Sequence, residues 1–202
     1  MRLRNIPGAQ DAILESPYVV QEPQTKKGHW GEVFVKKQPL HIEVGMGKGR
    51  FLMDLARLHP DINYIGIDLS PDVLGVARRN IQTRYEQENR KVENIALVAY
   101  DIERILQIMN ANDEIDRVYI NFCNPWPKMR HHKKRLTHTN QLQTYKTFIK
   151  DGAQIHFKTD DGGLYQSTLR YLRESGFEIL WYTTNLYENG QPPVDNITTE
   201  HE

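Results

Sequence analysis

A proline-rich segment carries the residue types best suited to chemistry in this chain. An apolar run that predicts a buried strand over 115–122 leads directly into Asn124, Pro125, Trp126, Pro127 and Lys128. Proline cannot donate to a strand ladder, so the two prolines end the strand and stiffen the turn that leaves it. An amide, an indole ring and an ammonium group are therefore expected at the carboxyl end of a strand, where open α/β sheets bind their ligands.

Positive charge follows this segment at once. Residues 128–135 contain five Lys or Arg, and residues 117–150 contain eight with no Asp or Glu, although the net charge of the chain is zero. A local excess of this size makes a basic patch whatever the total charge is. An aromatic pocket bordered by such charge indicates chemistry on a nucleic-acid base, with phosphate contacts from Lys128, Arg130, Lys133, Lys134 and Arg135. The simpler alternative is a proline-rich turn followed by a solvated basic loop.

A glycine-rich turn is the second motif with chemical content. Glu43 lies in a short strand predicted over 40–44, which is followed by Gly45, Gly47 and Gly49. Glycine lets the backbone turn tightly and approach a ligand closely, and G-x-G-x-G differs from the G-x-G-x-x-G of dinucleotide-binding folds. A carboxylate here would repel a pyrophosphate and attract an ammonium group, so the motif favours S-adenosylmethionine over NAD or ATP. The alternative is a purely structural turn.

Acidic residues follow the next two predicted strands. Asp68 comes directly after a strand predicted over 63–67, where a carboxylate can accept both hydroxyls of an adenosine ribose. Asp101 follows a strand predicted over 95–99 and is placed to meet the adenine amine. Asp68 also precedes a helix N-terminus, which favours an acid for structural reasons alone. Acidic residues at three successive strands nevertheless predict one cofactor site.

The elements that position these residues alternate along the chain. Helices are predicted over 51–58, 71–88, 102–109, 142–148 and 164–175, and further strands over 153–158 and 177–182. This alternation predicts an α/β fold, a doubly wound and mainly parallel sheet with helices on both faces. Residues 1–39 carry four prolines and weak patterning. We interpret them as an N-terminal arm that precedes one domain over 40–202.

Composition is that of an ordinary globular protein, with 39% hydrophobic and 26% charged residues among 202. The single cysteine, Cys123, rules out an internal disulfide and predicts a cytoplasmic protein. No apolar run approaches the roughly 20 residues of a membrane span, and no signal-peptide core is present, so no membrane partner is expected. His131 and His132 have no Cys or carboxylate at ligand spacing, so no metal site is expected.

Together the motifs resemble those of one enzyme family, the bacterial tRNA (guanine-N7)-methyltransferases. The resemblance rests on E-x-G-x-G-x-G, the strand-ending Asp68, N-F-C-N-P-W-P-K-M-R-H-H-K-K-R-L, F-K-T-D-D and T-E-H-E, in the family's order from about residue 40 to 202. It implies a Rossmann-like class I methyltransferase fold. It also implies transfer of a methyl group from S-adenosylmethionine to N7 of a guanine in the tRNA variable loop.

The resemblance assigns roles by position. It implies a cofactor site lined by the glycine turn and by Glu43, Asp68, Asp101 and Asn124. It implies substrate contacts from Lys128, Asp160, Thr199, Glu200, His201 and Glu202. Because guanine N7 carries a lone pair and no proton, the attack needs no general base, and the protein supplies orientation and electrostatics.

Asn124 stands where the family usually has Asp, in a D-P-W-P motif. A carboxylate would stabilise the cationic methylated guanine, whereas the amide supplies only a dipole. We therefore predict Asn124 as a catalytic residue that positions the base or contacts the cofactor, with activity retained at a reduced rate. Asp160 or Glu202 is the predicted carboxylate at the guanine edge, and Trp126 either stacks on the base or caps the sheet. Family members usually continue past Glu202 into a last strand, so we expect that a tail is lacking here.

Two other functions stay open. Asn-Pro-Trp-Pro resembles the N-P-P-[YFW] loop of amino-methyltransferases that act on adenine N6 or guanine N2 of RNA, where Asn accepts from the amine under attack. A non-catalytic RNA-binding relative could also keep this fold, although the intact glycine turn and Asp68 weigh against it. The basic run and T-E-H-E favour guanine N7. The expected partner is tRNA, and the sequence leaves monomer and homodimer open.

Overall fold

A single sheet organises the computed structural model, which describes residues 13–187 and 199. Within these residues the sheet has five strands in the order β3-β2-β1-β4-β5, and every neighbouring pair is parallel. The predicted doubly wound parallel sheet is therefore confirmed. The strands are β1 (Leu40–Val44), β2 (Asn63–Asp68), β3 (Ile95–Ala99), β4 (Ile115–Asn121) and β5 (Ile149–Lys158).

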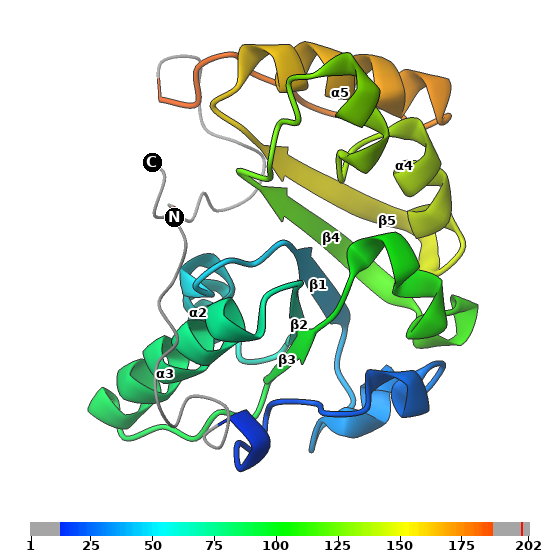
Figure 1. Ribbon diagram of the computed structural model, residues 1–202. Coiled ribbons are helices and arrows are strands. Elements are labelled where there is room, and N and C mark those ends of the chain that lie inside the picture. The colour runs from blue at the N-terminus through cyan, green and yellow to red at the C-terminus, as the bar shows by residue number, and fades with distance from the viewer. Residues whose placement is uncertain (1–12, 188–198, 200–202) are drawn as a thin grey trace.

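Helices cover both faces of the sheet (Figure 1). The pair α2 and α3 packs on one face, and the pair α4 and α5 packs on the other, so that each face has its own apolar cluster. The α-helices are α2 (Arg50–Leu58), α3 (Pro71–Gln87), α4 (Thr139–Lys146) and α5 (Gly162–Glu174). The 3-10 helices are η1 (Pro23–Lys26), η2 (Trp30–Val33), η3 (Ile102–Gln107), η4 (Ala111–Asp113) and η5 (Met129–Lys134).

The strand order reverses between β1 and β4. β1 pairs with β2 on one side and with β4 on the other, so the loops leaving β1 and β4 diverge at the carboxyl edge of the sheet. Open α/β sheets bind their ligands at such a reversal of strand order. Most residues of both strands are buried, as expected for central strands that are covered on two faces. Their polar residues include Glu43 and Asn121, which are buried near the carboxyl ends of β1 and β4, at this reversal.

Residues that precede β1 are fastened to the rest of the molecule. The Val20 amide donates to the Leu97 carbonyl at 2.9 Å, and the Leu97 amide donates to the Tyr18 carbonyl at 2.8 Å, so this segment extends the sheet beyond β3. Trp30 is fully buried, and its Nε1 donates to the Ile108 carbonyl at 2.7 Å. The boundary at residue 40 stays a prediction.

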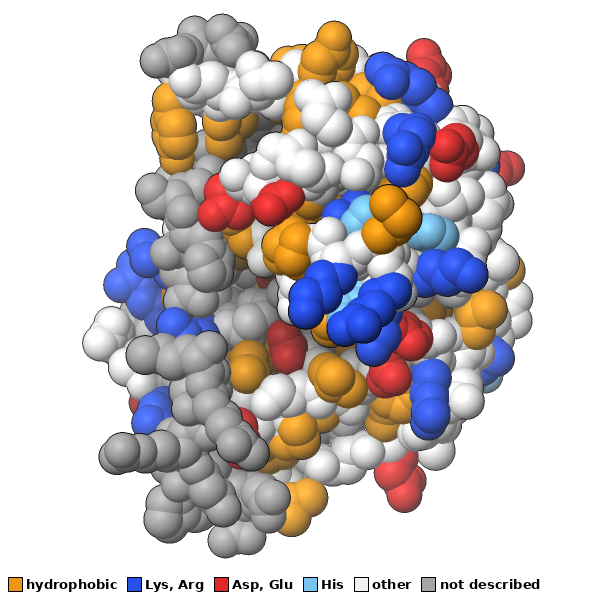
Figure 2. Space-filling model, turned by 45° about the horizontal axis from the view of Figure 1, so that its top comes forward, with side chains coloured by type: hydrophobic (Ala, Val, Ile, Leu, Met, Phe, Trp, Pro, Cys, Tyr) orange, Lys and Arg blue, Asp and Glu red, His pale blue; other side chains and the backbone are white. Residues whose placement is uncertain are grey.

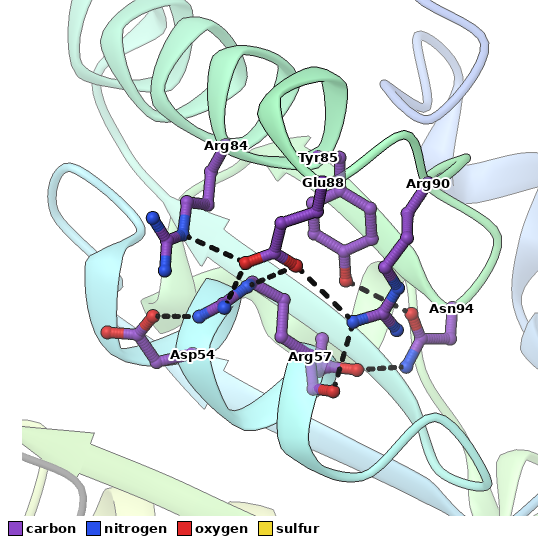
Figure 3. A network of polar contacts seen from close by, with 8 residues as sticks. Asp54, Arg57, Arg84, Tyr85, Glu88, Arg90 and Asn94 are labelled. Atoms are coloured by element: carbon purple, nitrogen blue, oxygen red, sulfur yellow. Dashed lines mark hydrogen bonds and ion pairs between the residues drawn. The ribbon is translucent and has the colours of Figure 1, made fainter.

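A polar network joins the carboxyl ends of α2 and α3 (Figure 3). Arg57 Nε donates to Glu88 Oε2 at 3.0 Å, and Arg84 and Arg90 approach the same carboxylate. Asn94 Nδ2 donates to backbone carbonyls that include that of Ala56 at 3.0 Å. The network fixes α2 against α3, the two helices that pack on β2 and β3.

Four predicted elements need correction. The helix predicted over 142–148 is α4, which spans Thr139–Lys146. Residues 177–182 form no strand in the described structure, because they do not pair with β5, the strand at that edge of the sheet. Residues 102–109 contain the 3-10 helix η3, which is interrupted by non-helical angles at Arg104. β5 begins at Ile149 and not at 153. Among the described helices, none is long and apolar enough to cross a membrane.

Candidate active site

The loop that leaves β1 turns over the end of β2. The Gly45 amide donates to the Ile67 carbonyl at 2.8 Å, which fixes where the turn begins. Gly47 has φ +55°, and a Cβ at this position would meet nothing within 4 Å. At Gly49, φ is +71° and a Cβ would lie 3.0 Å from that of Ala77, so glycine lets α2 start close against α3. The turn therefore combines a tight backbone with open space above Gly47.

Asp68 holds this turn from the end of β2. Its Oδ2 accepts from the Gly47 amide at 3.0 Å, and its Oδ1 accepts from the Ser70 amide at 3.1 Å. A carboxylate offers about four acceptor positions, so both oxygens can accept a further hydrogen bond. The structural role that the sequence allowed is thus present, and it leaves room for the predicted contact with ribose hydroxyls.

Glu43 lies in β1, beneath the glycine turn. The residue is 2% exposed, and its Oε1 accepts from Asn121 Nδ2 at 3.1 Å. Its Oε2 has no hydrogen-bond partner in the part of the chain that the structure describes. Burial raises the pKa of the Glu43 carboxyl to about 8, against the opposing effects of the Asn121 bond and of the nearby Leu52 backbone amide. A cation beside this carboxyl would restore the ionised form, so the position suits an ammonium group.

Asp101 follows β3 at the same edge. Its Oδ1 accepts from the Glu103 amide at 3.0 Å and caps η3. The Tyr100 amide donates to the Asp68 carbonyl at 2.8 Å, so the ends of β2 and β3 lie side by side. Glu43, Asp68 and Asp101 are therefore brought to one edge of the sheet, as their positions at the ends of successive strands predicted.

The segment that leaves β4 is a strained turn closed by Asn124. Asn124 Oδ1 accepts from the Trp126 amide at 3.0 Å. Phe122 and Trp126 have φ of +46° and +43°, in the left-handed region that bulky residues rarely adopt. Strained backbone of this kind is common where a loop must present groups to a ligand. The Trp126 ring is partly exposed, with Lys134 Nζ 5.3 Å from its centroid, so Trp126 is not a buried core residue.

Arg135 fastens this turn from below and is not a surface cation. It is 4% exposed, and its Nε donates to the Pro125 carbonyl at 2.8 Å. Its Nη2 also approaches the Trp126 carbonyl at 3.4 Å. The prediction that Arg135 contacts phosphate is therefore wrong, because its guanidinium is enclosed by the loop. The next residue, Leu136, lies against Gly45, where a Cβ would come within 3.3 Å of its Cδ1. The two loops thus meet at the reversal of the sheet.

Asp160 lies in the loop after β5, beside the turn that follows β4. The Phe122 amide donates to the Lys158 carbonyl at 2.9 Å, which extends the pairing of these strands to the carboxyl edge. Asp161 caps α5, because its Oδ1 accepts from the Leu164 amide at 2.6 Å. The cap is therefore Asp161, and Asp160 is exposed at the edge where a substrate is expected.

Comparison with known proteins adds independent information on what this site does. A family model described as "Putative methyltransferase" matches residues 37–202. The tRNA (guanine-N(7)-)-methyltransferase of Clostridium beijerinckii is 45% identical over 202 residues, which span 100% of this chain and 91% of that protein. The enzyme of the same name from Clostridium perfringens (strain SM101) is 44% identical and covers 100% and 92%. This chain belongs to the tRNA (guanine-N7)-methyltransferase family.

Solved structures agree with the fold of this family. A "putative methyltransferase" from Thermoplasma acidophilum superimposes with a TM-score of 0.51 and 19% identity, covering 77% of this chain and 62% of the other. Precorrin-6y C5,15-methyltransferase from Geobacter metallireducens gives a TM-score of 0.50 and 16% identity, with coverage of 69% and 63%. At these identities the likeness concerns the fold alone, and it confirms the predicted Rossmann-like class I methyltransferase fold.

In this member of the tRNA (guanine-N7)-methyltransferase family, basic side chains gather on the surface beside the turn after β4. Figure 2 shows Lys and Arg side chains clustered on this face. With Arg135 buried, the remaining members of the predicted basic run are exposed, and we call them the basic surface: Lys128, Arg130, Lys133 and Lys134. Among the described residues, no group of His, Cys, Asp and Glu forms a potential metal site.

The last predicted substrate residues fall mostly outside the described structure. Thr199 is described and is buried. Glu200, His201 and Glu202 lie outside the described residues, so their predicted contacts are not placed. Sequence reasoning missed Asn121 and the true position of Arg135. An asparagine inside an apolar strand was the available signal for Asn121.

Proposed function

We propose that this enzyme transfers a methyl group from S-adenosylmethionine to N7 of a guanine in the variable loop of tRNA. Membership of the tRNA (guanine-N7)-methyltransferase family supports the reaction class. The observation that carries the cofactor is the buried Glu43 carboxyl, whose Oε2 lacks a partner in the described structure and lies below an open glycine turn. An unpartnered buried acceptor calls for a donor from a ligand.

The residues at the carboxyl edge fit the parts of S-adenosylmethionine. Glu43 would bind the ammonium group, the remaining acceptor positions of Asp68 would bind the ribose hydroxyls, and Asp101 would meet the adenine amine. The open space above Gly47 admits the ligand against the backbone. The turn contains Lys48 but lacks the G-x-x-x-x-G-K-[ST] pattern of a phosphate-binding loop, and Glu43 would repel a pyrophosphate. When bound, S-adenosylmethionine supplies an electrophilic methyl group on a positively charged sulfur.

Guanine N7 supplies the attacking electron pair, so no residue of the chain has to remove a proton. The bond from N7 to the methyl carbon forms as the bond from that carbon to sulfur breaks, and the positive charge passes to the guanine ring. The protein therefore acts by aligning the two substrates and by stabilising this charge. Asp160, exposed beside the turn after β4, is the proposed carboxylate near the ring.

Asn124 is proposed to orient the guanine. Its Oδ1 already accepts from the Trp126 amide, which leaves the NH2 group and the second lone pair of Oδ1 for the base. The basic surface would hold the flanking phosphates, and Lys128 lies closest in sequence to this turn. We place the reaction in the cytoplasm, because tRNA is the proposed partner and the lone Cys123 fits a reducing compartment.

Transfer of a labelled methyl group from S-adenosylmethionine to unmodified tRNA tests this proposal. The wild-type chain is expected to label tRNA, and Glu43→Gln, which removes the charge that would hold the ammonium group, is expected to label it far more slowly. RNA of equal length with no variable loop serves as the negative control. Binding of tRNA without any label would favour the non-catalytic alternative.

A further inference from the structure

Asn121 and Glu43 form a buried polar pair at the reversal of the sheet. Glu43 is in register with Tyr119 across β1 and β4, so Asn121, two residues further along, projects from the same face. Asn121 Nδ2 donates to Glu43 Oε1 at 3.1 Å, and the two residues are 8% and 2% exposed. The pair lies beneath the turn that contains Gly47, on the ligand side of the sheet.

Each residue of the pair keeps one oxygen without a partner. Glu43 Oε2 and Asn121 Oδ1 are both buried, and neither has a hydrogen-bond partner in the described part of the chain. The charged or titratable neighbours that act on Glu43 are Asp68 at the end of β2 and Tyr119 on β4, and the Leu52 amide of α2 also favours the carboxylate. Lys158 on β5 is in register with Asn121, and its Nζ lies 5.7 Å from the centroid of the Phe51 ring. Two buried acceptors without donors are costly to leave unsatisfied, so the site is built for a donor from outside.

We propose that Asn121 is a positioning residue for Glu43 and that the free oxygens of the two side chains together accept hydrogen bonds from one primary ammonium group. This proposal rests on the proposed function and assigns the ammonium group to the methionine part of S-adenosylmethionine. A primary ammonium has three donors on one centre and can serve both oxygens. Asn121 therefore extends the cofactor site from β1 to β4, the strand that also carries the turn with Asn124.

The pair couples cofactor binding to protons. In the unliganded protein, burial keeps the pKa of Glu43 at about 8, so a large share of the carboxyl is protonated at neutral pH. The ammonium group requires the carboxylate, so binding releases that proton to solvent. Affinity should therefore rise with pH up to about 8. The Asn121 bond lowers this pKa, so its removal should shift the rise in affinity to higher pH.

A matched pair of ligands isolates the ammonium group. S-Adenosylhomocysteine carries an ammonium and no sulfonium charge, and its deaminated analogue keeps the adenosine, the thioether and the carboxylate. Calorimetric titration from pH 6 to 9 in two buffers of different ionisation enthalpy measures affinity and proton release together. For the wild-type chain we expect proton release and a pH-dependent affinity with S-adenosylhomocysteine, and neither with the deaminated analogue.

Substitution of Asn121 then separates positioning from a purely structural role. Asn121→Ala should weaken S-adenosylhomocysteine about tenfold at pH 7, move its pH dependence upward, and leave the deaminated analogue within about twofold. Equal weakening of both ligands, or an unmoved pH dependence, would overturn the proposal. Binding of the deaminated analogue and thermal melting report whether each variant is folded.

An exchange variant provides a second test that does not depend on the alanine variant. Asn121→Asp combined with Glu43→Gln restores one carboxylate and one amide in reversed places, so it should bind S-adenosylhomocysteine more tightly than either single variant. No recovery in the exchange variant would count against a shared ammonium site. If the wild-type chain binds neither ligand, S-adenosylmethionine is refuted as the cofactor as well. If the wild-type chain binds S-adenosylhomocysteine and methylates tRNA, and Asn121→Ala behaves like wild type, the proposed role of Asn121 is refuted and the proposed function is not.

Discussion

Arg135 Nε donates to the carbonyl oxygen of Pro125 at 2.8 Å, so a cation from the end of the basic run holds the turn in which Asn124 lies. The guanidinium also approaches the Trp126 carbonyl, next to a residue with φ of +43°. Strain of this kind persists only where surrounding contacts impose it. Arg135 is therefore a residue that shapes the proposed active site from within the protein.

Replacement of Arg135 by lysine should slow turnover about tenfold or more. Lysine keeps the charge but lacks the planar fork that reaches two carbonyls at once, so the turn would lose its fixed shape. The matched control is Arg130→Lys, the same substitution on the basic surface, for which little change is expected. Steady-state rates and melting temperatures make the comparison. A normal rate for Arg135→Lys, together with a shallower salt dependence of tRNA binding in Arg135→Ala, would show that Arg135 contacts phosphate after all.

The basic surface should make tRNA affinity depend steeply on salt although the net charge is zero. Replacing Arg130, Lys133 and Lys134 by alanine should flatten the plot of log affinity against log salt by roughly 0.7 to 0.9 for each phosphate contact removed. Lys36 and Lys37, which precede β1 at the opposite edge of the sheet, are the control pair. If the control pair flattens the slope and the basic surface does not, the RNA footprint lies on the N-terminal segment.

Much of the fold could be predicted from the sequence, because buried parallel strands appear as apolar runs between turn residues. β1 and β3 begin and end where they were predicted, and the glycine turn was correctly placed between β1 and α2. The run at 177–182 was misleading, because an apolar segment becomes a strand only when a neighbour pairs with it. Whether a neighbour is present depends on the tertiary structure and cannot be recognised from the local sequence.

The candidate site could be predicted from the sequence only in part. Glu43, Asp68 and Asp101 lie at or just after the carboxyl ends of three successive strands, so parallel topology alone brings them together. Arg135 could not be recognised, since within a run of cations nothing distinguishes a buried guanidinium whose partners are carbonyls ten residues upstream. Asn121 was passed over because its partner, Glu43, is distant in the chain and becomes a neighbour only through the pairing of β1 with β4.

Glu43→Gln should make the unliganded protein more stable than wild type at neutral and alkaline pH. The folded-state pKa of Glu43 is raised to about 8 from an ordinary value near 4.5, so its contribution to stability is present at low pH and is lost as pH rises toward 8. Each tenfold difference in proton affinity is worth about 1.4 kcal/mol, so the gain should reach a few kcal/mol at pH 8 and vanish near pH 4. Urea unfolding at pH 4 and pH 8 measures the difference in unfolding free energy between the variant and wild type. An equal difference at both pH values would contradict a raised pKa for Glu43.

Asn124→Asp should raise turnover, by up to about tenfold, and Asn124→Ala should lower it strongly. A carboxylate accepts the Trp126 amide as the present Oδ1 does, so the turn is kept and a negative charge is added beside the methylated guanine. Alanine removes the bond that closes the turn. Asn112→Asp, at an exposed position on η4, is the control. Single-turnover rates with saturating tRNA and cofactor suppress losses of binding. An alanine variant as fast as wild type would remove Asn124 from the active site.

The position of the transferred methyl group tests the central claim most directly. Unmodified tRNA is incubated with the wild-type chain and S-adenosylmethionine, digested, and mapped by mass spectrometry to find the methylated nucleotide. A second, undigested sample of the RNA is treated with borohydride and aniline, which cleave the RNA strand at N7-methylguanosine, where the ring has become cationic. We predict one methyl group on a guanine of the variable loop, at a site that these reagents cleave. A methyl group on adenine N6 or guanine N2, at a site that resists cleavage, would contradict the account.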